Sequence, residues 1–301
     1  MEAASAGADP MTLWKEYLHP QSVQQAVEAL AFSPAPAIPI AGGTDLMLDL
    51  QQGHHPPVHT LVDLTGIPEL QALEIRNERL FIGAGVPHHR IVESSLVRQH
   101  AASLVESCGL IGGPQVRNAA TLGGNVAHAL PAADGTIGLL ALNAEAEIAS
   151  LAGRRLLPLH ELFAGPGKST LAHDEIIVGF YIPLRKPGQG SAFCRVMRAQ
   201  GIALPILNLA VWLERQDEII RAARIAVGPA GPTPFRALQT SAYLTGKPFC
   251  EETILGAQQA LLAEAQFRTS PARATAEYRR KLVVVLLKTA LLSAWHRASE
   301  Q

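Results

Sequence analysis

The chain has 301 residues, 48 % of them hydrophobic and 17 % charged, and 25 Lys and Arg against 26 Asp and Glu leave a formal net charge of −1. This length predicts two domains, or one large unit built from subdomains, and the composition excludes a mainly disordered chain. The balanced charge argues against nucleic acid as a partner, and three widely spaced cysteines argue against both a disulfide framework and a four-thiolate iron–sulfur cluster.

The first eleven residues contain neither the basic region nor the apolar region of a secretory signal. The cysteine usage suits a reducing compartment. The sequence therefore predicts a cytoplasmic protein.

The first part of the chain alternates helix and strand signals. Residues 22–32 have helical periodicity, with Ser22 as the expected N-cap and Pro34 and Pro36 as helix breakers. Residues 37–41, 61–64 and 80–82 read as strands, and residues 46–50 form a second apolar periodic piece. This order indicates an α/β arrangement.

Residues 109–134 are the least ordinary segment. They contain five glycines and two prolines together with apolar residues that would be buried. Glycine and proline punctuate regular structure, so this segment is predicted to be ordered but irregular backbone.

The second half of the chain predicts a separate domain. Strands are expected at 144–149 and 176–182, and the Pro- and Gly-rich residues 183–190 read as a linker. Beyond it, residues 192–197, 206–215 and 219–227 alternate like antiparallel strands, and helices are expected at 251–265 and 275–298. The C-terminal domain is therefore predicted to be α+β.

The longest apolar stretch, residues 282–295, is interrupted by Lys288 and is shorter than the roughly 20 residues that span a bilayer. We therefore expect a core helix and no membrane span. Its expected packed face carries Tyr278, Leu282, Val285, Leu286 and Leu292, and its basic residues, Arg279, Arg280, Lys281 and Lys288, are expected elsewhere on the helix.

Two familiar site patterns fail. Residues 165–169 (GPGKS) resemble a phosphate loop, but that motif needs a glycine where this chain has Leu162. His54, His55 and His59 have no acidic residue or cysteine at a convincing ligand spacing, which favours a solvated loop over a metal site.

Two glycine-rich loops remain, AGGTD at 41–45 and TLGGN at 121–125. A Gly-Gly pair allows positive φ and close backbone approach, so consecutive N–H groups could surround a pyrophosphate without any lysine. Each loop alone reads more simply as a turn between strands. Two such loops together favour a cofactor site.

These loops, with GPQVRN at 113–118, PAAD at 131–134, FAGPGKS at 163–169 and EYRR at 277–280, resemble the FAD-binding medium subunit of molybdenum hydroxylases of the xanthine dehydrogenase and carbon monoxide dehydrogenase type. The resemblance extends from about Trp14 to Trp295. It implies an α+β protein with a vanillyl-alcohol-oxidase-like (PCMH-type) FAD-binding domain of two α/β subdomains, 11–65 and 66–187, and a C-terminal α+β domain at 191–301.

The resemblance also implies noncovalent FAD and a set of residues that bind it. The glycine loops would hold the pyrophosphate and Asp134 a polar part of the cofactor, although a helix N-cap role would explain Asp134 as well. The isoleucines of the set would lie against the flavin or the adenine, or simply in the core. The implied set is Ile40, Ala41, Gly42, Gly43, Thr44, Asp45, Leu46, Ile111, Thr121, Leu122, Gly123, Gly124, Asn125, Asp134 and Ile177.

The function implied by the resemblance is electron transfer within a complex. Electrons would come from 2Fe-2S clusters on a small partner subunit and pass through FAD to NAD or another acceptor, while the molybdenum cofactor would sit on a large molybdopterin-binding subunit, in a dimer of heterotrimers. No catalytic residue and no metal ligand is expected in this chain, because the flavin supplies the redox chemistry.

Two departures from the family pattern leave the electron acceptor open. Cys194 stands where some relatives have a lysine, and residues 198–203 lack the acidic residue of the family's pattern.

Two other functions remain open at this stage. One is a free-standing flavin oxidase or dehydrogenase, and the other is a flavin-free structural subunit. Against the first, no His or Cys stands in the setting of a covalent flavin link. His128, beside the second glycine loop, is explained more simply by a local hydrogen bond.

Overall fold

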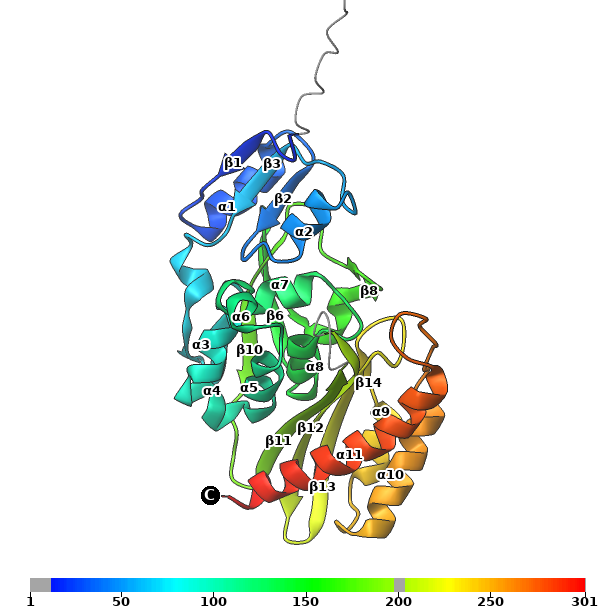
Figure 1. Cartoon of the computed structure of the whole chain (residues 1–301). Coiled ribbons are helices and arrows are strands. Elements are labelled where there is room, and N and C mark those ends of the chain that lie inside the picture. The colour runs from blue at the N-terminus through cyan, green and yellow to red at the C-terminus, as the bar shows by residue number, and fades with distance from the viewer. Residues whose placement is uncertain (1–11, 198–203, 301) are drawn as a thin grey trace, which may run out of the picture.

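In the computed structural model, which describes residues 12–197 and 204–300, the first strand and helix signals build a parallel sheet of three strands in the order β1–β3–β2. The strands are β1 (Glu16–Leu18), β2 (Ala37–Ile40) and β3 (Thr60–Asp63), and the helices are α1 (Val23–Phe32) and α2 (Leu46–Gln51). Ser22 caps α1 as expected, because its hydroxyl accepts a hydrogen bond from the N–H of Gln25. These elements form the N-terminal unit at the top of Figure 1.

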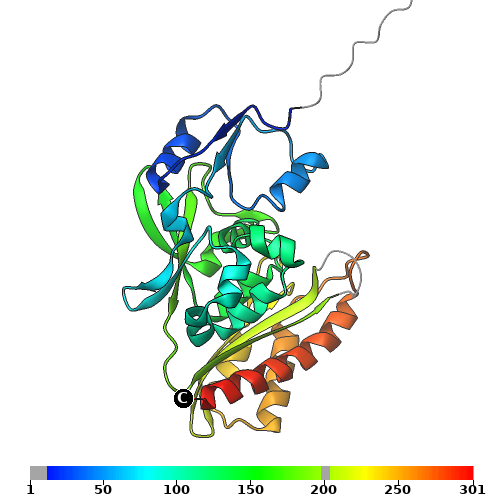
Figure 2. The same ribbon diagram turned by 60° about the vertical axis from the view of Figure 1, so that its left-hand side comes forward.

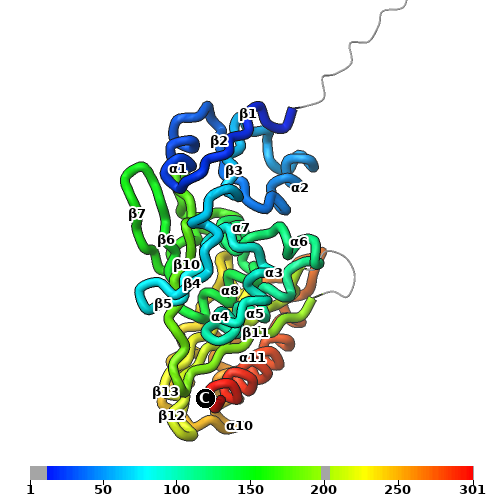
Figure 3. The backbone as a smooth tube through the Cα atoms, turned by 90° about the vertical axis from the view of Figure 1, so that its left-hand side faces the viewer, coloured from blue at the N-terminus to red at the C-terminus, as the bar shows by residue number. Residues whose placement is uncertain are grey.

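The middle unit combines an antiparallel sheet with a layer of short helices. The sheet order is β4–β5–β10–β6–β7, and its β6–β7 hairpin stands away from the helices (Figure 3). The strands are β4 (Leu73–Arg76), β5 (Arg79–Gly83), β6 (Glu145–Ser150), β7 (Gly153–Pro158) and β10 (Ile176–Pro183), with a small β8 (Phe163–Gly165) and β9 (Lys168–Ser169) pair beside them. The helices are α3 (His88–Glu93), α4 (Ser95–His100), α5 (Ala102–Gly109), α6 (Pro114–Ala119), α7 (Leu122–Ala127) and α8 (Asp134–Ala141), with 3₁₀ turns at Pro68–Gln71 and Leu159–Leu162.

The expectation of irregular backbone at 109–134 is wrong, because α6 and α7 lie within it. Pro114 occupies the first turn of α6, where a missing N–H costs nothing, and the Thr121 hydroxyl caps α7. Each of these helices has only six residues, which is too short for a recognisable apolar period. Capping and neighbouring structure therefore decide their conformation.

The C-terminal unit is the antiparallel sheet with helices that the sequence predicts. Its strands follow the order β11–β12–β13–β14, and its helices cover one face (Figure 2). The elements are β11 (Gln189–Met197), β12 (Pro205–Gln216), β13 (Ile219–Gly228), β14 (Phe235–Arg236), α9 (Leu238–Leu244), α10 (Glu251–Glu264) and α11 (Ala276–Ser299). The other face packs on α5 and α8 of the middle unit, so the two units share one core. The departure noted at 198–203 lies outside the described residues.

The expected packed face of α11 is right at Leu286, which is buried, and at Leu282, which packs against the core, but wrong at the other three positions. Val285 is 61 % exposed, and Tyr278 and Leu292 are also exposed, whereas Arg279 is only 1 % exposed. The buried residues are Arg279, Val283, Leu286, Leu287, Ala290, Leu291, Ala294 and Ala298. Both stripes of the helix are largely apolar, so periodicity alone could not choose between them.

Small residues set how closely α11 approaches the sheet. A side chain at Gly190 of β11 would place its Cβ 2.1 Å from the carbonyl oxygen of Ala294. By length and composition α11 could cross a membrane, but its leucine and alanine stripe packs against β11 and β12. This packing agrees with the expected core helix.

Candidate functional site

A cavity of about 870 Å³ lies where the three units meet, a size typical of small-ligand sites. Its lining comes from the β2–α2 loop, the α6–α7 and α7–α8 segments, the start of β12, and the α10–α11 loop. The apolar part of the lining exceeds the polar part, with polar groups at a few positions. Segments far apart in the sequence therefore converge on one site.

Most of the expected site residues line this cavity. Leu122, Gly123 and Ile177 do not: Leu122 and Ile177 lie in the core of the middle unit, and Gly123 is buried beneath the second loop. The lining residues among the expected set are Ile40, Ala41, Gly42, Gly43, Thr44, Asp45, Leu46, Ile111, Thr121, Gly124, Asn125 and Asp134.

The first glycine loop offers unpaired backbone donors. Within the described residues, the N–H groups of Gly42, Gly43, Thr44 and Asp45 donate no hydrogen bond. Gly43 has a φ of +66°, which only glycine adopts readily. Consecutive N–H groups around a left-handed residue form a concave anion site.

Gly42 serves a different purpose in the same loop. A Cβ at this position would lie 2.0 Å from the carbonyl oxygen of Ala119 at the end of α6. The missing side chain lets the first loop pack directly against the segment that leads into the second. Gly42 therefore brings the two loops together.

The second glycine loop differs from the expectation. Neither of its glycines has a positive φ, and its N–H groups are already used: Leu122 donates to Val86, Gly123 to Ala84, and Gly124 to the Thr121 hydroxyl. A Cβ at Gly123 would meet Ala84 at 2.6 Å, so this glycine is required by packing.

Gly124 has an open side toward the cavity. A Cβ at this position would meet only the Thr121 hydroxyl, at 3.3 Å. The second loop therefore contributes room for a ligand, and the N–H groups of Leu122, Gly123 and Gly124 are not free for anion binding.

An ion pair joins the two loops. His128, which ends α7, places its Nδ1 3.2 Å from Oδ2 of Asp45. This hydrogen bond lowers the pKa of Asp45 and raises the pKa of His128. His128 thus has a hydrogen-bonded partner, as expected, although the partner lies on the other loop.

Asp134 is held from both sides by the C-terminal sheet. Arg195 of β11 donates to its Oδ2, and the Asn208 side chain of β12 donates to its Oδ1 at 2.6 Å. Burial raises the pKa of Asp134 to about 6, although both partners oppose this. The N-cap interpretation is wrong, because Asp134 is the first helical residue and Ala133 occupies the cap position.

Sequence reasoning missed several polar residues of this site. Asn208 interrupts the apolar run near the start of β12, and this interruption could have identified it as a candidate site residue. Cys194 lies on the opposite side of β11, against the core of the C-terminal unit, whereas its neighbour Arg195 reaches Asp134. Strand alternation explains this difference between adjacent residues.

His88 was also missed, and its side chain is the most unusual of the lining. It is 1 % exposed, and its Nδ1 has no hydrogen-bond partner in the part of the chain that the structure describes. Burial, with the nearby Arg117, lowers the pKa of His88 to about 4. A neutral imidazole with an unused ring nitrogen therefore faces the cavity beside the glycine loops.

These features fit a bound dinucleotide. The first loop offers unpaired N–H groups for a pyrophosphate, Gly124 leaves room, and His88 has an unused polar atom. Ile111 lies in a turn fixed by Arg117, which donates to the carbonyl oxygens of Ile111 and Gly112. Across residues 12–197 and 204–300, no three His, Cys, Asp or Glu residues converge as metal ligands.

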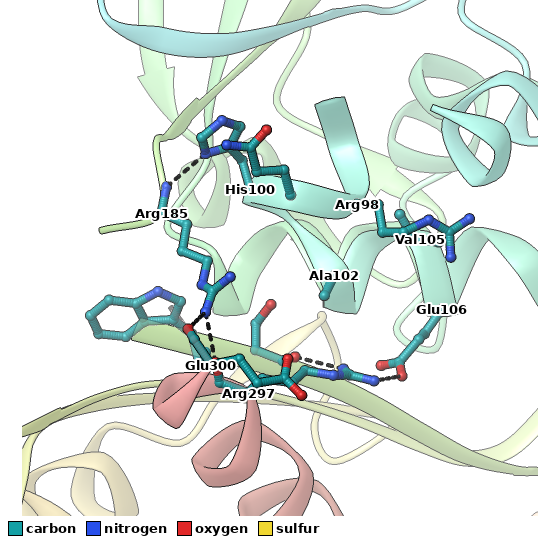
Figure 4. Close-up of a pocket in the computed structure, with 12 residues that line it drawn as sticks. Arg98, His100, Ala102, Val105, Glu106, Arg185, Arg297 and Glu300 are labelled. Carbon is teal, nitrogen blue, oxygen red and sulfur yellow. Dashed lines mark hydrogen bonds and ion pairs between the residues drawn. The ribbon is translucent and has the colours of Figure 1, made fainter. Parts of the chain in front are cut away.

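A smaller pocket of about 310 Å³ separates α4 and α5 from the C-terminal sheet and the end of α11 (Figure 4). Glu106 accepts from Arg297 at 2.5 Å and from the N–H of Phe193 at 2.7 Å. Arg185 donates to the carbonyl oxygens of Arg297 and Glu300. We refer to Glu106, Arg185 and Arg297 with these partners as the interdomain junction.

Comparison with known families covers nearly the whole chain. Residues 11–185 match the model described as the FAD binding domain in molybdopterin dehydrogenase, and residues 191–294 match the CO dehydrogenase flavoprotein C-terminal domain. These matches agree with the predicted fold class of a PCMH-type FAD-binding domain followed by an α+β domain.

Individual relatives share this length. The nicotine 6-hydroxylase medium subunit of Paenarthrobacter nicotinovorans is 34 % identical over 93 % of this chain and 97 % of its own. The xanthine dehydrogenase FAD-binding subunit of Escherichia coli O157:H7 is 29 % identical over 92 % of this chain and 95 % of its own. A solved carbon monoxide dehydrogenase chain from Hydrogenophaga pseudoflava superposes with a TM-score of 0.89 at 29 % identity, covering 94 % of this chain and 98 % of that one.

Proposed function

The chain belongs to the FAD-binding medium subunits of the molybdenum hydroxylases, and from this premise we propose that it is the subunit through which electrons leave such a complex. Its acceptor would be NAD or another small molecule. The observation that carries the proposal is the first glycine loop, whose four unpaired N–H groups line a cavity large enough for a nucleotide cofactor.

The cofactor is noncovalent FAD, one per chain, in this proposal. The first loop binds its pyrophosphate, and Gly124 leaves space for it. Bound FAD would supply the redox chemistry, while the chain binds it, orients it and keeps water from it. Asp134, fixed by Arg195 and Asn208, offers a rigid polar contact in the lining.

The partners in this proposal are a large molybdopterin-binding subunit and a small 2Fe-2S subunit, assembled as a dimer of heterotrimers in the cytoplasm. Relatives of this chain are named as a medium subunit or an FAD-binding subunit, which supports the presence of partner subunits. The proposed domains are residues 11–187 for FAD binding and residues 191–301 for the C-terminal domain that covers it.

The test combines flavin release with purification of the complex. Acid precipitation of the purified chain should release its yellow colour into solution, and co-expression with the two partners should yield a complex that contains molybdenum and iron. Colour retained by the precipitate would indicate a covalent flavin instead.

Measurements of activity and FAD binding on the isolated chain also distinguish this proposal from the two alternative functions. A single chain that oxidised a small organic substrate at about 1 to 1,000 turnovers per second would favour a free-standing oxidase. A chain that bound no FAD even when supplied with excess would favour a structural subunit.

A further inference from the structure

The C-terminal wall of the cavity carries a buried arginine with unused hydrogen-bond donors. Arg279 lies in the second turn of α11, is 1 % exposed and lines the cavity. Its Nε and Nη1 are buried and have no hydrogen-bond partner among residues 12–197 and 204–300. A buried guanidinium without a partner is strongly destabilising, so a partner supplied by a ligand is the simplest reason for its presence.

Two more arginines line the same wall. Arg268 and Arg273 come from the loop between α10 and α11, which lies at the end of the C-terminal sheet nearest the N-terminal unit (Figure 1). Burial and repulsion from these two arginines lower the pKa of Arg279. Three cations close enough to repel one another favour a bound anion.

The loop that carries them is held in place. Ser270 and Ala274 exchange two backbone hydrogen bonds, and the Thr269 hydroxyl accepts from the N–H of Ala276. The Thr275 hydroxyl caps α11 by accepting from the N–H of Tyr278. The backbone that carries Arg268, Arg273 and Arg279, which we call the arginine wall, is therefore held by hydrogen bonds within the loop and at the helix cap.

The acidic residues of the cavity are committed elsewhere. Asp134 is paired with Arg195 and Asn208, and Asp45 is paired with His128. The third acidic residue of the lining, Asp49, lies 3.6 Å from Nδ1 of His54 through its Oδ1. A guanidinium matches the oxygens of a phosphate group in geometry as well as in charge. The anion that suits this wall is therefore a phosphate brought by a ligand.

We propose that the arginine wall is a phosphate-binding subsite for a nucleotide, separate from the first glycine loop. The proposal rests on the proposed function only in taking the cavity as a nucleotide site. The phosphate can come from two sources: FAD itself, or a second nucleotide that accepts electrons from the complex.

The experiment compares Arg279→Met with Arg280→Met. Arg280 is the adjacent, exposed residue, which donates to the carbonyl oxygen of Leu262 and does not line the cavity. Apoprotein is titrated with FAD, and both FAD-loaded and apo forms are titrated with inorganic pyrophosphate by calorimetry. Circular dichroism and thermal unfolding report on the fold.

A second nucleotide as the source predicts that pyrophosphate binds the FAD-loaded wild type and Arg280→Met, and binds Arg279→Met ten- to a hundredfold more weakly. FAD itself as the source predicts that pyrophosphate competes with FAD for the apoprotein and that Arg279→Met weakens FAD binding by a similar factor. Either result supports the subsite.

Affinities for FAD and pyrophosphate that do not depend on Arg279 would overturn the proposal. So would a marked loss of apoprotein stability in Arg279→Met, because removal of an unpaired buried charge should leave stability unchanged or higher. If Arg279→Met failed to fold, Arg268→Gln in the exposed part of the loop should still weaken pyrophosphate binding. Pyrophosphate binding to apoprotein that takes up no FAD would contradict the proposed function while leaving the subsite intact.

Discussion

The cavity and the interdomain junction both lie between the middle unit and the C-terminal unit, yet they differ in whether their polar side chains have hydrogen-bond partners. At the junction, Glu106 uses both carboxylate oxygens, and Arg185 and Arg297 donate to several carbonyl oxygens. In the cavity, His88 and Arg279 keep buried donors or acceptors unused. Satisfied buried groups fix a structure, whereas unsatisfied ones are rare and need an explanation, which a bound ligand would supply for two groups that line a cavity.

The largest effect on FAD binding is expected from a substitution that displaces the unpaired N–H groups of the first loop. Gly43→Val should weaken FAD binding by a hundredfold or more, because a β-branched residue does not tolerate a φ of +66° and the loop must turn. Loss of two charge-assisted hydrogen bonds, at roughly 1.5–3 kcal/mol each, accounts for that factor. The measurement is fluorescence titration of the apoprotein with FAD, with circular dichroism to check the fold.

Gly53→Val is the matched control for that variant. Gly53 also has a positive φ, +72°, but it does not line the cavity and has no neighbour within 4 Å of an added Cβ. Its backbone strain should be similar and its FAD affinity unchanged. Equal FAD affinity in the two variants would remove the first loop from the cofactor site.

The unpaired imidazole of His88 predicts an acid-sensitive apoprotein. Its pKa falls from 6.5 to about 4 on folding, so the unfolded chain binds more protons between these values and stability decreases as the pH falls. The shift corresponds to about 3 kcal/mol by pH 4, and His88→Leu should remove most of it. The measurement is urea unfolding of the apoprotein between pH 4 and pH 7.

Asp134 acts in the opposite direction and provides the control. Its pKa rises to about 6 on folding, so its contribution to stability decreases as the pH rises from 3.8 to 6. Asp134→Asn should therefore steepen the loss of stability on acidification. An identical pH dependence in wild type and His88→Leu would show that His88 is not the acid-sensitive group.

The junction predicts the smallest effect, and one confined to stability. Glu106→Gln should lower the free energy of unfolding by about 1 to 2 kcal/mol, because it removes the charge that Arg297 pairs with while both side chains remain about a third exposed. FAD affinity should stay the same. Urea unfolding and FAD titration measure the two quantities.

Glu277→Gln, which breaks an exposed pair with Lys281, should cost less than Glu106→Gln. A tenfold change in FAD affinity in Glu106→Gln would mean that the junction and the cavity are not independent. The contrast between paired and unpaired groups would then need revision.

Secondary structure was predicted well from the sequence where the periodic patterns of apolar residues are long. The helix after Ser22 and the antiparallel strands of the C-terminal unit follow from period and capping, and both glycine loops lie at the cavity. Short helices such as α6 escaped prediction because six residues contain too little periodicity.

Side-chain orientation was harder to predict than position. The two glycine loops look alike in sequence, but among the described residues only the first has a glycine with positive φ and glycine N–H groups without a hydrogen bond, because the second packs against Ala84 and Val86. Arg279 seemed an ordinary surface residue, since the stripes on either side of α11 are similarly apolar. These properties depend on contacts between distant segments.

The positions of the lining residues along the sequence also constrain when the cofactor can be enclosed. The lining begins at Ile38 and extends to Arg279, so the ribosome must synthesise the chain through α11 before every wall exists. The middle unit shares its core with the C-terminal sheet, so that core is also completed only after the C-terminal unit has been synthesised. Complete enclosure of the cofactor is therefore a late event in biogenesis, which follows docking of the C-terminal unit.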